Sequence, residues 1–176
     1  LFDNTIIIYT SDHGFSLGNH GIWGHGMAAW PSSIHRPSFN IPLIFSGPGV
    51  KEGKSKALVS QLDIANTILS LTKSSKLKGG RVDSRSLVLS NESHKNRDKV
   101  FMEQEESRAV RTKKWLFINR FNKEGMDRLS SELYDLEKDP DEQNNLSDEK
   151  KLIHIIQMLN KDLMEYFEKH SDPSYD

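Results

Sequence analysis

The sequence of 176 residues contains no cysteine. This absence excludes disulfide bonds, cysteine–zinc sites and a cysteine nucleophile within the chain. The sequence also lacks any apolar run of about 18 residues, so no transmembrane segment is expected. An excess of either charge is missing too, because 24 basic and 25 acidic residues give a formal net charge of −1. A nucleic-acid-binding surface is therefore not expected to be the main function.

The length and composition are those of a globular protein. Apolar residues make up 35% of the chain and charged residues 28%, a balance that supports a hydrophobic core. The length is enough for one ordinary domain and marginal for two. An apolar run, TIIIYT at residues 5–10, begins almost at the first residue. Natural domains rarely open so close to a buried strand, so we expect a fragment whose upstream part, with any targeting signal, is missing.

The first half of the chain has the pattern of an α/β fold. Residues 5–10 are β-branched and aromatic without polar alternation, which predicts an interior strand of a parallel sheet, buried on both faces. A second apolar strand is predicted at residues 41–46, before a Gly-Pro-Gly turn. Apolar residues recur at helical spacing in residues 60–71, which predicts an amphipathic helix.

The second half has a different pattern. Short strands are predicted at residues 100–103, 107–111, 115–121 and 132–136. Apolar residues then recur at spacings of three and four between residues 152 and 167, which predicts a long amphipathic helix. The predicted fold class is therefore α/β, with part of a mostly parallel sheet in residues 1–98 and a smaller antiparallel α+β subdomain in residues 99–176.

Asp12 and His13 directly follow the strand predicted at residues 5–10. Polar residues at the carboxyl end of a buried strand lie where open α/β sheets place their sites. A carboxylate favours a hard divalent cation such as calcium or magnesium, whereas imidazole more often indicates zinc or iron. The pair suggests a cation site. The alternative is that Asp12 turns the chain and His13 is a hydrogen-bonded loop histidine.

Residues 14–38 lack helical or strand periodicity and are rich in glycine, histidine and tryptophan. A loop of this length in a globular domain is usually functional or disordered. His20 and His25 lie in this loop and are candidates for ligand binding, although a surface loop can also carry histidines for solubility. His35 and Arg36 could bind an anion, or they could simply be exposed to solvent.

A family pattern runs through most of the chain in five segments. The first, IIIYTSDHGFSLGNHGIWGHG, joins a strand to the motifs T-S-D-H-G and L-G-x-H-G. The others are IPLIFSGPGV, LVSQLDIANTILSL, DSRSL, and AVRTKKWLFI with ELYDLEKDPDEQNNL. In this order the segments resemble the C-terminal portion of type I sulfatases, which belong to the alkaline-phosphatase-like superfamily. Asn66 departs from the pattern, because the family usually has proline there.

The resemblance implies an enzyme that hydrolyses sulfate monoesters. Asp12 and His13 match two metal ligands, and the metal is usually calcium, with magnesium or another divalent cation as alternatives. The remaining ligands, and the cysteine or serine that is converted to the formylglycine nucleophile, would lie upstream of this chain. The chain alone is therefore expected to be inactive.

A second departure concerns the anion site. The family usually has a sulfate-binding lysine thirteen residues after the metal aspartate, and that position is His25 in this sequence. The resemblance implies that His25 takes this catalytic role, because a protonated imidazole also stabilises a developing anion. The segment between His25 and Ile41 is longer than the common pattern, which makes His20, His35 and Arg36 further candidates for substrate binding.

Two other readings stay open. One is a phosphonate or phosphodiester hydrolase of the same superfamily, and the other is a non-catalytic binding module. The expected partner is a small-molecule or carbohydrate sulfate ester, not a nucleic acid, and the oligomeric state is left open. The resemblance suggests a periplasmic, extracellular or lysosomal location.

Overall fold

The computed structural model describes residues 2–25, 31–74, 84–87, 97–120 and 130–171. Its helices are α1 (Arg36–Phe39), α2 (Leu62–Leu71) and α3 (Ile153–His170), with 3-10 turns at Phe2–Asn4, Asn19–Gly21 and Lys150–Leu152. Its strands are β1 (Ile7–Thr10), β2 (Ser16–Leu17), β3 (Trp23–Gly24), β4 (Leu43–Ser46), β5 (Val100–Gln104), β6 (Ser107–Arg111), β7 (Trp115–Arg120) and β8 (Glu132–Asp135). None of the described helices is long and apolar enough to cross a membrane.

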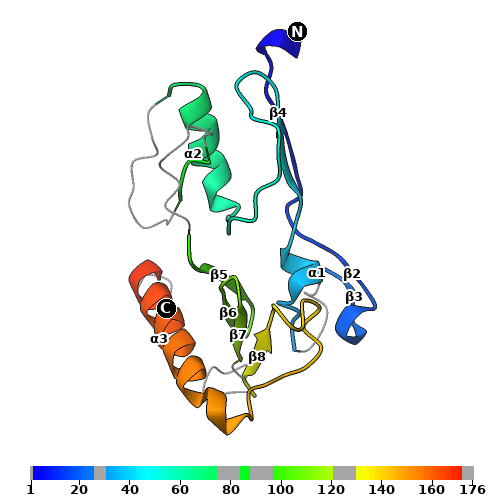
Figure 1. Cartoon of the computed structure of the whole chain (residues 1–176), viewed down its shortest axis with the longest axis vertical. Coiled ribbons are helices and arrows are strands. Elements are labelled where there is room, and N and C mark those ends of the chain that lie inside the picture. The colour runs from blue at the N-terminus through cyan, green and yellow to red at the C-terminus, as the bar shows by residue number, and fades with distance from the viewer. Residues whose placement is uncertain (1, 26–30, 75–83, 88–96, 121–129, 172–176) are drawn as a thin grey trace.

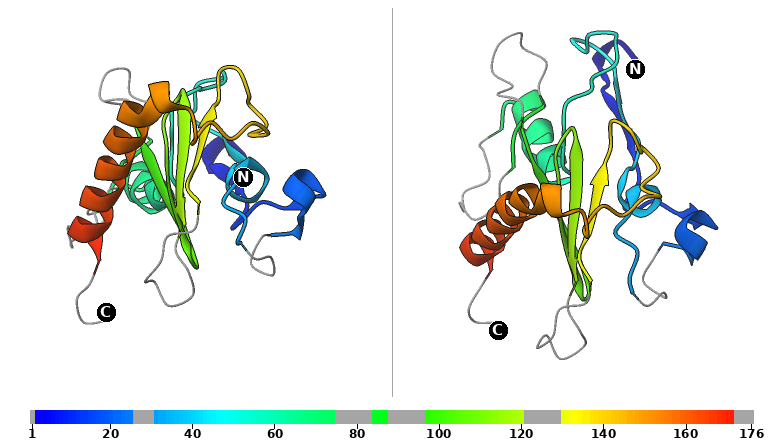
Figure 2. Two further views of the ribbon diagram at one scale, coloured as in Figure 1. Left: turned by 90° about the horizontal axis from the view of Figure 1, so that it is seen from below. Right: turned by 60° about the horizontal axis from the view of Figure 1, so that its bottom comes forward.

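The C-terminal half of the chain forms an antiparallel sheet with the strand order β5-β6-β7-β8 (Figure 1). Successive side chains of a strand point to opposite faces, and α3 lies along one face of this sheet (Figure 2). Five fully buried residues join that face to the helix: Val110, Phe117, Leu133, Leu159 and Leu163. The predicted antiparallel sheet with its terminal helix is therefore confirmed. The domain boundary between residues 98 and 99 stays a prediction.

The burial of Leu159 gives a direct test of this packing. We expect Leu159→Ala to lower the free energy of unfolding by about 2–5 kcal/mol, because the substitution removes buried methyl groups and leaves a cavity. Met158 is the matched control, since it lies next along α3 and is 50% exposed. Met158→Ala should change the stability by less than about 0.5 kcal/mol. Urea unfolding measures both values, and equal costs for the two variants would contradict the packing of α3.

The opposite face of the sheet packs against residues 31–39. Its core consists of Ile34, Ala109, Leu116, Ile118, Tyr134 and Leu136. Ile34, near the end of the loop predicted at residues 14–38, belongs to this core, and Phe39 of α1 packs against it. The sheet is thus buried on both faces, and its second face fixes the position of residues 31–39.

β1 departs from the sequence prediction. It pairs antiparallel with β4, and among the described residues these two strands form a sheet of their own. Ile7 is 48% exposed and Tyr9 is 61% exposed, so the interior parallel strand expected at residues 5–10 is not present in the part of the chain that the structure describes. The physical reason is that an apolar run indicates a preference for burial without specifying which segments cover it.

α2 follows its predicted helical pattern and carries a buried ion pair. Both terminal nitrogens of Arg97 donate to the carboxylate of Asp63, which also accepts from the backbone N–H of Arg85. Burial alone would raise the pKa of Asp63, but the hydrogen bonds and charge of Arg97 hold it below its ordinary value. Asn66, at the position where proline was expected, donates to Ser84. These contacts hold residues 84 and 85 against α2.

Candidate active site

Three of the residues singled out in the sequence line one cavity. The cavity has a volume of ≈ 620 Å³, and Asp12, His13 and His25 contribute to its wall. The rings of His13 and His25 lie 4.9 Å apart between centroids. The other walls come from α1, the start of α2 and the edge strand β5. The structure therefore places Asp12 and His13, the predicted ligands of one cation, beside His25, the predicted anion-binding histidine.

The side chains of Asp12 and His13 are arranged as two ligands of one cation would be. His13 Nδ1 lies 2.8 Å from the carbonyl oxygen of Gly14. A carbonyl only accepts, so Nδ1 carries the proton and Nε2 presents a lone pair. His13 Nε2 and Asp12 Oδ2 lie 3.8 Å apart, which matches the roughly 3.5–4 Å between neighbouring ligands held about 2.4 Å from an ion.

The charge of Asp12 suits this role. Its Oδ1 accepts the backbone N–H of His13 at 2.9 Å, and Ser11 Oγ lies 3.4 Å away. The backbone N–H of His13, followed by the backbone N–H of Asp12 itself, holds the pKa of Asp12 below its ordinary value. Its Oδ2 remains directed toward His13 Nε2. The donor set of one carboxylate and one imidazole fits a divalent cation.

Hydrogen bonds from two sides hold the main chain around Asp12 and His13, and neither set was predicted from the sequence. Gln61, just before α2, donates from Nε2 to the carbonyl oxygens of Ser11 and Asp12 at 2.8 Å each. On the other side, the N–H of Gly14 donates to Ser38 of α1 at 2.8 Å. A Cβ on Gly14 would lie 2.0 Å from the carbonyl oxygen of Pro37. The glycine of the S-D-H-G motif is therefore required by this close approach.

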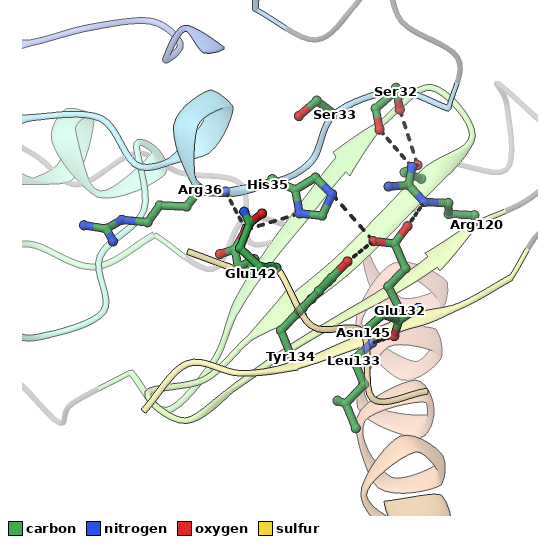
Figure 3. Close-up of polar contacts among 12 residues, drawn as sticks. Ser32, Ser33, His35, Arg36, Arg120, Glu132, Leu133, Tyr134, Glu142 and Asn145 are labelled. Carbon is green, nitrogen blue, oxygen red and sulfur yellow. Dashed lines mark hydrogen bonds and ion pairs between the residues drawn. The ribbon is translucent and has the colours of Figure 1, made fainter. Parts of the chain in front are cut away.

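His20, His35 and Arg36 lie in a different place from His25. His35 and Arg36 belong to a polar cluster with Glu142 at the C-terminal sheet (Figure 3), and His20 joins the cluster through His35. The rings of His20 and His35 stack at 3.8 Å with an interplanar angle of 7°. Arg36 Nη1 contacts the carbonyl oxygen of Pro140 and the carboxylate of Asp141. Whether these three residues bind substrate stays a prediction.

His35 occupies the centre of this cluster and is buried. Its Nδ1 lies 3.2 Å from Glu142, and its Nε2 lies 3.5 Å from Glu132. Burial alone would raise the pKa of both carboxyls, but hydrogen bonds outweigh it and hold both values low. For Glu132 the main donors are Tyr134 and Arg120, and for Glu142 the main one is His35. The cluster is thus a network of ionised carboxylates and their donors.

One possible metal-ligand atom from each of His20, His35 and Glu142 lies within 4.8 Å of the others. The geometry of these groups nevertheless does not suit a metal ion. A ligating nitrogen directs its lone pair in the plane of its ring, so two ligating rings must have planes that meet at the ion. The rings of His20 and His35 are nearly parallel and stacked. Both oxygens of Glu142 already accept hydrogen bonds. Burial, with His35 as the second cause, lowers the pKa of His20 and favours its neutral form.

Comparison with known proteins now places the chain. The family model for the C-terminal domain of N-sulphoglucosamine sulphohydrolase matches residues 31–169. The chain belongs to the sulfatase family. Its sequence is 30% identical to a choline-sulfatase of Rhizobium meliloti over 84% of this chain and 28% of that relative. It is 26% identical to a Δ4,5-hexuronate-2-O-sulfatase of Bacteroides thetaiotaomicron over 96% of this chain and 36% of that enzyme.

Solved structures agree with this assignment. A protein in complex with its substrate D-glucosamine-2-N,6-O-disulfate superposes with a TM-score of 0.79 at 27% identity, over 97% of this chain and 35% of that one. A phosphonate monoester hydrolase of Agrobacterium radiobacter gives a TM-score of 0.75 at 21% identity, over 97% and 36%. The latter likeness shows a shared fold alone. This sulfatase chain spans 28% to 36% of the length of three relatives that it matches over most of its own sequence.

Proposed function

We propose that this chain is the C-terminal portion of an enzyme that hydrolyses sulfate monoesters of a small molecule or carbohydrate. The observation that carries the proposal is the convergence of Asp12, His13 and His25 in one cavity, with the first two poised as a ligand pair. Sulfatase relatives named for choline and hexuronate, and a related structure that holds a disulfated glucosamine, support this substrate class.

In this proposal Asp12 Oδ2 and His13 Nε2 hold one divalent cation, calcium in the first place and magnesium as the alternative. A cation bound there supplies positive charge to the sulfate oxygens as negative charge develops on them. The lowered pKa of Asp12 keeps its carboxylate ionised, and Gln61 fixes the backbone beneath it. The remaining ligands and a formylglycine nucleophile belong to a segment outside this chain. The chain by itself is accordingly inactive.

The role of His25 follows from its place beside His13. Its ring reaches the same cavity, so a protonated imidazole can donate a hydrogen bond to a sulfate held at the cation pair. A charge-assisted bond of this kind is roughly twice as strong as a neutral one. His25 thus takes the place of the lysine that the family pattern leads one to expect, and it binds the anion rather than the metal.

A phosphonate or phosphodiester hydrolase is the second candidate. The fold shared with a phosphonate monoester hydrolase and the histidine at position 25 both favour it. A third candidate is a non-catalytic module that binds calcium without turning over an ester. The three candidates differ in reaction, not in the residues that line the cavity.

One experiment separates them. The complete polypeptide is assayed with 4-nitrophenyl sulfate, a 4-nitrophenyl phosphonate monoester and bis-4-nitrophenyl phosphate, which share one leaving group. A higher kcat/KM on the sulfate supports the proposed function. A higher value on either phosphorus ester replaces it with the second candidate. Calcium binding by calorimetry without turnover of any of the three esters leaves only the binding module.

A further inference from the structure

Glu142 is an unusual residue in the polar cluster. Its side chain has no exposed surface, although it carries a charge. Its backbone has a φ of 58°, a left-handed conformation that residues other than glycine seldom adopt. Strained conformations of this kind persist only where the surrounding structure enforces them, and they gather at functional sites. Glu142 lies far in sequence from the cation pair, so its role must be carried by contacts.

The turn around Glu142 is fixed by its own hydrogen bonds. The two oxygens of Asp139 accept the N–H groups of Gln143 and Asn144, and the N–H of Glu142 donates to the Asp139 carbonyl. Asn145 Oδ1 accepts the N–H of Leu133 in β8. The segment after β8 is therefore tied to the sheet on both sides of Glu142, and its carboxylate is held in one place.

From this fixed position the carboxylate of Glu142 accepts a hydrogen bond from α1. Its Oε2 accepts the backbone N–H of Arg36, the first residue of α1, at 2.8 Å (Figure 3). Its Oε1 accepts from Arg111 of β6 at 2.9 Å. One carboxylate thus joins the sheet to α1. Hydrogen bonds to charged groups contribute more than neutral ones, and the buried site protects this one from water.

α1 in turn contacts Gly14, the residue that directly follows Asp12 and His13. Its residue Ser38 accepts the N–H of Gly14 at 2.8 Å, and the backbone of Pro37 fills the space that a side chain on Gly14 would need. Gly14 follows Asp12 and His13 directly, so any shift of α1 moves the end of the loop that presents both ligands. Two hydrogen bonds, one at Arg36 and one at Ser38, therefore connect Glu142 to this loop.

We propose that Glu142 is a positioning residue for the Asp12–His13 pair, acting through α1 and Gly14. The identity of the pair as a cation site rests on the proposed function, whereas the mechanical link does not. Glu142 does not touch the cavity or the reacting atoms. It sets the place of α1, and through it the place of the loop end that presents the two ligand side chains.

The test compares Glu142→Gln with Glu132→Gln in the complete polypeptide. Both variants remove one carboxylate that faces His35, but Glu132 makes no hydrogen bond to α1 among the described contacts. Hydrogen exchange of the Gly14 amide is measured relative to that of Phe117, a buried residue of β7 that reports global opening. We expect Glu142→Gln to raise this ratio about tenfold, the scale of one charged hydrogen bond. Glu132→Gln should leave the ratio unchanged.

A second pair of variants tests the hydrogen bond from the N–H of Arg36 without changing the carboxylate of Glu142. Arg36→Pro deletes the backbone N–H, and proline is tolerated at the first position of a helix. His35 already has the extended φ and ψ of −79° and 167° that a following proline requires. Arg36→Ala keeps the N–H and is the control for amide exchange. Only the proline variant should raise the Gly14 ratio, so the link can be tested even if Glu142→Gln does not fold.

Calcium titration of the same proteins connects this link to the site. We expect Glu142→Gln to weaken calcium binding by about tenfold and to lower kcat more than it raises KM, while Glu132→Gln changes neither. The proposal is overturned if the Gly14 ratio rises equally in both glutamine variants, or if it rises in Glu142→Gln without loss of calcium affinity. A wild-type protein that hydrolyses no sulfate ester overturns the proposed function instead, and the exchange ratio still reports on the link.

Discussion

Asp12→Asn is expected to lower kcat/KM of the complete enzyme on a sulfate monoester by about 10³-fold, the equivalent of about 4 kcal/mol of transition-state stabilisation. The amide keeps the acceptor for the N–H of His13, so the local turn is preserved. It removes the negative charge that attracts a divalent cation. Calcium affinity, measured by calorimetry, should fall together with activity.

The exposure of Asp12 makes this result separable from unfolding. The Asp12 side chain is 86% exposed, so the substitution should change the free energy of unfolding by less than about 0.5 kcal/mol. Asp148 is the matched control, because it is also exposed and lies in the C-terminal segment away from the cavity. Asp148→Asn should retain full activity. Full activity of Asp12→Asn would show that this carboxylate does not hold a catalytic cation.

His25→Ala is expected to lower kcat/KM by about 10²-fold, the scale of losing one donor to a developing anion. Its ring lies beside that of His13 in the cavity, so the interaction lost under the proposed function is the one with the sulfate oxygens. His25→Lys should recover part of the activity, because an ammonium group supplies a positive donor from the same position. Steady-state kinetics on a single sulfate ester measures both variants.

The control for His25 is His154, which is exposed on α3. His154→Ala should leave the kinetics unchanged, since this side chain lies outside the cavity. Wild-type activity of His25→Ala would mean that other groups hold the anion, with His20, His35 and Arg36 as the remaining candidates from the sequence. A loss of activity in His25→Lys as large as in His25→Ala would instead show that the imidazole itself is required.

The sequence by itself determined features that depend on neighbours along the chain. The alternation in residues 107–111 and 115–121 predicted β6 and β7, because successive side chains of a strand point to opposite faces of the sheet. The stripe from residue 152 to 167 predicted α3 for the corresponding reason in a helix. Asp12 and His13 were identified because they follow a strand directly, so their proximity needs no tertiary contact.

Only the tertiary structure decided which distant groups meet. The sequence made His25 a candidate for the catalytic role and His35 a candidate for substrate binding, yet packing places His25 at the cavity and His35 against Glu142, 107 residues later in the chain. Tertiary packing likewise set the pairing of β1 with β4 and the hydrogen bond from Gln61 to the Ser11 carbonyl. Local spacing constrains residues within a few positions of one another. Contacts across such separations form only when whole elements pack, and their free energy depends on surfaces that no short motif encodes.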